Sequence, residues 1–144
     1  MKARHFINKL EHDAIVGAIA EAERKMHGEI RVFISRKEPP DVVAAAQEAF
    51  VHLGMDKTRM RNGVLIYVAP RAHKFAVIGD TAVHAKCGEE FWKEVVEEMA
   101  AHFRGGQFTE AIIHGIRRAG KLLSEHFPHH RGDTNQLSNE IVED

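Results

Sequence analysis

Four oxygen-bearing side chains far apart in the sequence could together bind a metal ion. Glu29, Asn62 and Asp80 flank predicted β-strands, and Asp56 lies in the polar segment before the second of them. Carboxylate and amide oxygens are hard ligands, which suit Ca²⁺ or Mg²⁺ better than Zn²⁺. The prediction therefore depends on whether the fold brings these widely spaced positions to one place.

Each of these residues also has an ordinary structural interpretation. Asn62 precedes a glycine, and this pair is common in turns. Asp80 precedes a predicted turn of helix at residues 81–86 and could act as its N-cap. Glu29 could be a solvated strand end. The residue types alone leave both interpretations open.

Three β-strands are expected to position these residues. Residues 29–35 alternate between apolar and polar side chains, which is typical of a strand with one buried face. Residues 63–69 form a continuous apolar run bounded by turn residues, which indicates a strand buried on both faces. The link to the third strand, residues 74–79, is so short that the second and third strands must run antiparallel.

Helical patterns surround these strands. Asn8 and Asp41 are the expected N-caps of the first two helices, and Gly28 and Gly54 are their expected ends. The expected helices lie at residues 8–28, 42–53, 89–103 and 109–126. The inward positions are expected to be Val43, Ala46, Phe50 and Leu53 on the second helix, and Ile112, Ile116, Ala119 and Leu123 on the last.

The order of these elements, α-β-α-β-β-α-α, predicts the topology. A helix connects the first two strands, so these strands should be parallel with a right-handed crossover. We therefore expect an α/β fold, a three-layer α/β/α sandwich with a small mixed sheet. The first two strands begin at one edge and the third returns to it. Glu29, Asn62 and Asp80 should meet at that edge, with Asp56 nearby.

The opposite edge of the predicted sheet carries basic residues. They are Arg36, Lys37, Arg71 and His73. Open α/β sheets usually bind ligands at this edge, beyond the carboxyl ends of their parallel strands. The basic residues could bind an anion there, or they could form an ordinary solvated rim.

Composition limits the classes of protein that the chain can represent. The chain has 144 residues, with 20 Lys and Arg against 21 Asp and Glu, so no excess of positive charge favours nucleic acid. A single cysteine, Cys87, excludes an internal disulfide. We see no apolar run of the ~18 residues that a membrane span needs, and no signal peptide. We predict a cytoplasmic protein with one domain, residues 1–127, and a polar tail, residues 128–144.

Three stretches in this order and spacing resemble the TPM domain family over about residues 6–127. They are Gly28-Glu29-Ile30, Asn62-Gly63-Val64-Leu65 and Phe103-Arg104-Gly105-Gly106. The family includes bacterial proteins and thylakoid lumen proteins linked to photosystem II repair. Many relatives have a signal peptide and a membrane anchor, which we do not find here, so the chain resembles a soluble, stand-alone member.

The resemblance implies an α/β/α sandwich and divalent-metal binding, with Glu29, Asn62 and Asp80 as the matching polar residues. Acid phosphatase activity has been assigned to some relatives. Many relatives carry a glutamate shortly after the third strand, where this chain has Asp80 followed by Thr81-Ala82-Val83. Three functions stay open: a domain that binds Ca²⁺ or Mg²⁺, a metal-assisted acid phosphatase of low specificity, and a non-catalytic adaptor for an unknown protein partner.

Overall fold

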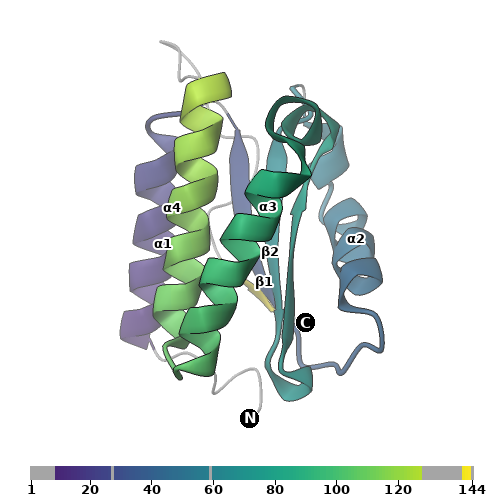
Figure 1. Cartoon of the computed structure of the whole chain (residues 1–144), viewed down its shortest axis with the longest axis vertical. Coiled ribbons are helices and arrows are strands. Elements are labelled where there is room, and N and C mark those ends of the chain that lie inside the picture. The colour runs from purple at the N-terminus through teal and green to yellow at the C-terminus, as the bar shows by residue number, and fades with distance from the viewer. Residues whose placement is uncertain (1–8, 27, 59, 128–140, 144) are drawn as a thin grey trace.

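A mixed four-stranded sheet forms the middle layer of the protein. The computed structural model describes residues 9–26, 28–58, 60–127 and 141–143. The strands lie in the order β3-β2-β1-β4, with α1, α3 and α4 on one face of the sheet and α2 on the other (Figure 1). The predicted three-layer α/β/α sandwich is confirmed.

The strand directions agree with the prediction. The strands are β1 (Glu29–Ile34), β2 (Gly63–Ala69), β3 (Lys74–Gly79) and β4 (Val142–Glu143). β1 and β2 are parallel, and β3 is antiparallel to β2. The bounds of β2 and β3 are as predicted, and β1 ends one residue early. β4 comes from the polar tail and pairs in parallel with the end of β1, where Phe33 faces Val142.

The helices are α1 (Lys9–Glu23), α2 (Val42–His52), α3 (Thr81–Arg104) and α4 (Phe108–His126). Two short 3₁₀ helices, η2 (Met55–Lys57) and η3 (Pro70–Ala72), precede and follow β2. The predicted turn at 81–86 and the helix at 89–103 belong to one element, α3, which is interrupted at Gly88 (φ 73°, ψ 172°). No helix in the described ranges combines the length and apolar character that crossing a membrane requires.

The predicted helix ends are partly correct. Asp41 caps α2, because its Oδ1 accepts a hydrogen bond from the Ala44 N–H at 3.1 Å. Gly54 adopts the expected left-handed conformation, with φ 74°. The expected end of the first helix at Gly28 is wrong, because α1 stops at Glu23. The chain leaves the helix in a tight turn, in which the Lys25 N–H donates a hydrogen bond to the Ala22 carbonyl. The expected cap, Asn8, lies outside the described residues.

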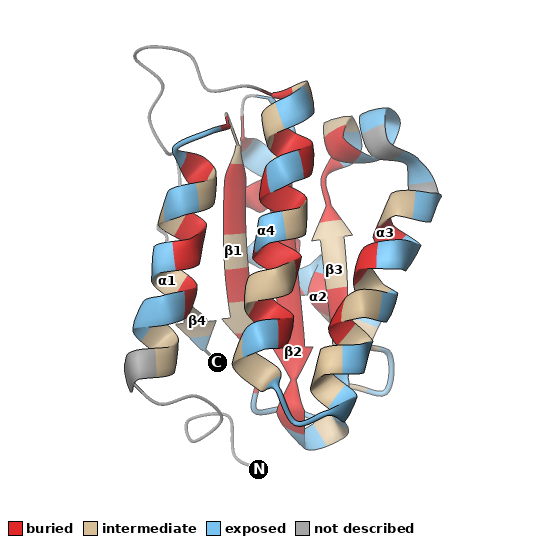
Figure 2. Cartoon of the chain, turned by 60° about the vertical axis from the view of Figure 1, so that its left-hand side comes forward, coloured by how far each residue is buried: buried red, intermediate tan, exposed pale blue. Residues whose placement is uncertain are grey.

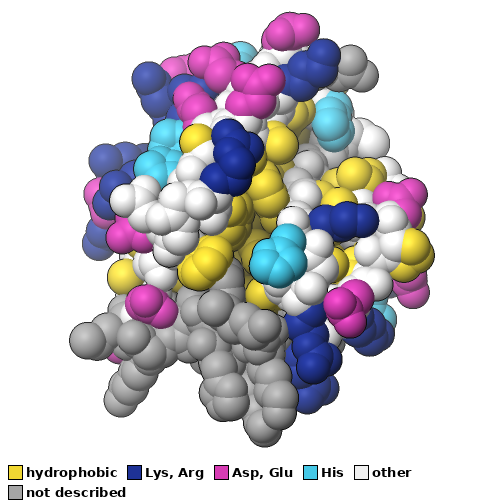
Figure 3. All heavy atoms as spheres, turned by 60° about the horizontal axis from the view of Figure 1, so that its bottom comes forward, with side chains coloured by type: hydrophobic (Ala, Val, Ile, Leu, Met, Phe, Trp, Pro, Cys, Tyr) yellow, Lys and Arg dark blue, Asp and Glu magenta, His cyan; other side chains and the backbone are white. Residues whose placement is uncertain are grey.

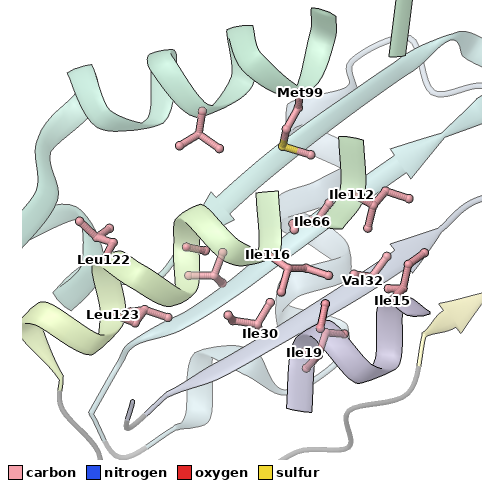
Figure 4. Packing of buried hydrophobic residues seen from close by; sticks show 14 of the residues in the cluster. Ile15, Ile19, Ile30, Val32, Ile66, Met99, Ile112, Ile116, Leu122 and Leu123 are labelled. Carbon is pink, nitrogen blue, oxygen red and sulfur yellow. The ribbon is translucent and has the colours of Figure 1, made fainter. Parts of the chain in front are cut away.

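Two apolar cores lie on the two faces of the sheet. Every residue of β2 is buried, which agrees with its continuous apolar sequence (Figure 2). Under α2, the core contains Ala46 and Phe50 as predicted, whereas Val43 is 49% exposed and Val42 packs against the core in its place. On the other face, Ile15, Ile19, Met99, Ile112 and Ile116 of the helices pack onto Ile30, Val32 and Ile66 of the strands (Figure 4).

A glycine allows α1 and α4 to approach closely. A Cβ added at Gly120 would lie 2.8 Å from the Cβ of Ala22, which the backbone of α1 holds in place. We expect Gly120→Ala to lower the free energy of unfolding by about 1–3 kcal/mol, because α1 and α4 would have to separate. Gly17, with nothing within 4 Å of an added Cβ, is the control.

Gly17→Ala should instead stabilise the protein by about 0.5–1 kcal/mol, because alanine favours a helix over glycine. Urea unfolding of both variants measures the two changes. Equal effects of the same sign would contradict the close packing of α1 on α4.

Candidate functional site

The amino end of the parallel strands brings three of the predicted residues to the same end of the sheet. Glu29 pairs with Gly63 at the first position of the β1–β2 ladder, directly after Asn62. β3 returns to this end, where the Asp80 N–H donates a hydrogen bond to the Gly63 carbonyl at 2.9 Å. This end lies at the top of Figure 1. The predicted directions of all three strands thus place Glu29, Asn62 and Asp80 together.

These three side chains are buried. The exposed fractions of Glu29, Asn62 and Asp80 are 3%, 2% and 5%. The interpretation of Glu29 as a solvated strand end is therefore wrong. Asn62 packs on the backbone of Gly28, since a Cβ there would lie 3.3 Å from the Asn62 Nδ2 and backbone O atoms. A small residue at position 28 is thus needed to seat the amide of Asn62.

A third buried acid, Glu23, lies beside Glu29. It is the last residue of α1 and is 3% exposed. Its Oε2 accepts a hydrogen bond from the Ile30 N–H at 3.0 Å, and its side chain is hydrogen-bonded to that of Glu29. Burial, and to a smaller extent the charge and hydrogen bond of Glu29, raise the pKa of Glu23 to about 8, although the hydrogen bond from the Ile30 N–H acts to lower it. The two acids therefore retain a proton at neutral pH.

The sequence contains a signal for Glu23 that we did not use. Glu23 follows Ile15 and Ile19 at spacings of eight and four residues, so it occupies the apolar stripe of α1. An acid on such a stripe must be hydrogen-bonded when buried. The partner, the Ile30 N–H, could be identified only once the chain reversal between α1 and β1 was known.

Asp80 is held by an ion pair with Arg61, which the sequence reasoning also missed. Arg61 Nε lies 3.0 Å from Asp80 Oδ2, and Arg61 Nη2 lies 3.1 Å from Oδ1. Asp80 Oδ1 also accepts the Thr81 N–H at 2.7 Å, so Asp80 is the N-cap of α3. The capping interpretation of Asp80 is confirmed. Each of these three hydrogen bonds occupies a lone pair of the carboxylate, which is then not available to a cation.

Arg61 occupies an unusual backbone conformation. Its φ is 53°, in the left-handed region, which a non-glycine residue rarely adopts. The turn before β2 thus uses Arg61, and not Asn62 or Gly63, as its left-handed residue. The Arg61 N–H donates to the Thr58 carbonyl, and the Arg61 carbonyl accepts from Ala82. These contacts fix the guanidinium in front of Asp80.

Asp56, the fourth predicted residue, lies in η2 near Arg61. The pKa of Arg61 is raised chiefly by its hydrogen bond to Asp80 and the charge of Asp80, and further by the charge of Asp56. Asp56 Oδ1 and the Thr58 hydroxyl are buried and have no hydrogen-bond partner within the described residues. Two oxygen atoms that could accept a ligand thus lie in the segment that leads into β2.

The site therefore contains two groups of acids at one end of the sheet. One is the Glu23–Glu29 pair beside Asn62, and the other is Asp80 with Arg61 and Asp56. Within the described part of the chain, no three His, Cys, Asp or Glu side chains are grouped closely enough to hold a metal ion by themselves. The donors are all oxygens, which are the kind that Ca²⁺ and Mg²⁺ take. Amide, backbone or water oxygens would have to complete a coordination shell.

Comparison with known proteins agrees with the fold. The TPM domain pattern matches residues 1–122. The BA42 protein of the psychrophilic bacterium Bizionia argentinensis is 35% identical over 99% of both chains, and its NMR structure superimposes with a TM-score of 0.91. The N-terminal domain of a P. gingivalis protein shares the fold at 15% identity, with a TM-score of 0.67 over 88% of this chain and 83% of that one. A search of the curated proteins found no match.

Proposed function

Because this chain belongs to the TPM domain family, we propose that the amino end of its sheet binds a divalent cation, Ca²⁺ or Mg²⁺. The proposed ligands are Glu29, Asn62, Asp80 and Asp56, with Glu23 beside them. The observation that carries the proposal is the contact between two buried carboxylates, Glu23 and Glu29. The strand pairing holds Glu29 in place, and the Ile30 N–H holds Glu23.

A divalent cation would stabilise this pair of acids. Two carboxylates in contact in a buried position repel each other when both are ionised. A cation between or beside them offsets this repulsion and replaces the proton that the pair retains at neutral pH. Cation binding should therefore release a proton, and the affinity should rise as the pH increases through about 8.

Arg61 limits how well Asp80 can bind a cation. The guanidinium is a fixed positive charge on the carboxylate of Asp80, at 3.0 and 3.1 Å. It repels an incoming cation and occupies lone pairs on both oxygens of Asp80. If Asp80 is a ligand, the Arg61→Gln variant should bind Ca²⁺ more tightly than the wild-type protein.

Calorimetric titration of chelator-stripped protein with Ca²⁺ and with Mg²⁺ tests the proposal. We expect saturable binding that weakens at least about tenfold in Glu29→Gln and in Asp80→Asn, because each variant removes one anionic ligand but keeps the shape of the side chain. The Glu110→Gln variant is the matched control, because Glu110 is exposed on the first turn of α4, at the other end of the sheet.

The same titration can reject the proposal. Unchanged affinity in both Glu29→Gln and Asp80→Asn would show that any cation binds elsewhere, and no binding by the wild-type protein would remove the proposal altogether. The phosphatase and adaptor functions and the cytoplasmic location stay predictions.

A further inference from the structure

A pocket lies at the end of the sheet opposite to the buried acids, beyond the carboxyl ends of β1 and β2. It is a cavity of about 300 Å³ between η3, the start of β3 and the junction of α3 and α4. Figure 3 views this end of the molecule and shows hydrophobic side chains in a hollow, with basic and histidine side chains around it. Open α/β sheets commonly bind small ligands at this end.

Aromatic rings from three elements form the walls of the pocket. They are Phe75 of β3, Phe103 of α3 and Phe108 of α4. The ring centroids of Phe75 and Phe103 are 4.9 Å apart, and those of Phe103 and Phe108 are 6.2 Å apart. Each ring is partly exposed while packing on the core beneath. Ala100 also lines the pocket, and its small side chain leaves space between the rings. We call this open apolar pocket the cup.

The rim of the cup is basic. His73, Lys74 and Arg104 line it and are exposed, and the part of the pocket lining that is described contains no Asp or Glu. The Lys74 ammonium itself lies 3.5 Å from the Pro40 carbonyl, on the face of the sheet that α2 covers, so Arg104 is the permanently charged side chain left at the rim. Arg71 follows on the same edge, with its Nη1 3.4 Å from the Arg36 carbonyl.

We propose that this cup binds a small amphipathic carboxylate, with its apolar body between the phenylalanine rings and its carboxylate at Arg104, beside His73. The volume and the apolar walls with few polar groups are typical of small-molecule sites. The basic rim selects an anionic head group through charge-assisted hydrogen bonds. This site is separate from the acid-lined end and does not depend on the cation proposal.

Amide NMR titration of the full chain with octanoate tests the proposal. We expect saturable shifts at Phe75, Ala100 and Phe103. Octylammonium has the same alkyl chain and the opposite charge, and 1-octanol has no charge. We expect both to bind roughly tenfold more weakly than octanoate or not at all, because the rim attracts only an anion.

Two pairs of variants locate the ligand. Ala100→Leu fills the cup and should abolish octanoate binding, whereas Ala101→Leu, on the exposed side of α3, should not. Arg104→Glu should weaken binding roughly threefold to tenfold. Its control is Arg117→Glu, the same reversal of charge on an exposed residue of α4 outside the pocket, which should leave the affinity unchanged.

Three results would overturn the proposal. The first is the absence of saturable shifts with octanoate, and the second is equal affinity for octanoate and octylammonium. The third is a response of the same amide signals to something other than octanoate, with no response to octanoate itself. A change on dilution would assign the cup to a second copy of the chain, and a change on adding vesicles of anionic phospholipid would assign it to a membrane surface.

Discussion

The Glu23→Gln variant will lose most of the pH dependence of stability that the wild-type protein shows between about pH 5 and 8. Burial beside Glu29 raises the pKa of Glu23 from 4.5 to about 8 in the folded protein. In this range the folded protein keeps a proton that the unfolded chain releases. The wild-type free energy of unfolding is therefore highest below the unfolded pKa and falls as the pH rises, by up to about 1.4 kcal/mol per pH unit.

Urea unfolding at several pH values measures this slope. Glutamine keeps the shape and the acceptor oxygen for the Ile30 N–H but cannot ionise, so Glu23→Gln should be more stable than the wild-type protein at pH 8 and above. Glu21→Gln, at an exposed position of α1, is the control and should keep the wild-type slope. Parallel stability curves for the wild-type protein and Glu23→Gln would show that Glu23 is not a buried, protonated acid.

The Asp80→Ala variant will lose more stability than the loss of a helix cap alone can explain. Asp80 is buried, caps α3 through the Thr81 N–H and also holds Arg61. We expect Asp80→Ala to cost about 2–3 kcal/mol, because it removes a buried group that accepts several hydrogen bonds. The matched control is Asp41→Ala, which removes the exposed N-cap of α2 and should cost about 1 kcal/mol.

A double-mutant cycle separates the two roles of Asp80. If the ion pair adds to the cap, Asp80→Ala will cost less in an Arg61→Ala background than in the wild-type protein. If Asp80→Ala lowers the free energy of unfolding equally in the two backgrounds, the ion pair with Arg61 adds no stability beyond the N-cap. Thermal unfolding of the wild-type protein, the two single variants and the double variant at one fixed pH is a suitable measurement.

The sequence pattern was sufficient for the sheet because the strands have strong local signals. The continuous apolar run of β2 and the short link to β3 determined both strands to the residue. The strands' directions then placed Glu29, Asn62 and Asp80 at one end. α1 was predicted too long because its apolar stripe continues past Glu23, while the chain turns back there to let Glu23 reach the Ile30 N–H.

The features that were missed depend on contacts between distant segments. The ion pair of Arg61 and Asp80 joins residues 19 positions apart through an unusual left-handed turn. β4 is only two residues long and has no alternating pattern. Gly88 was included in no predicted helix, but α3 continues through it. Local patterns cannot identify such partners, because each becomes apparent only when the packed structure brings the segments together.

A calcium titration followed by amide NMR is the most direct test of cation binding at the amino end of the sheet. If a cation binds there, Glu29, Asn62 and Asp80 will show saturable shifts, and Phe75, Phe103 and Phe108 at the other end will show none. Shifts confined to residues away from Glu29 and Asp80, or no saturable shift at all, would contradict it.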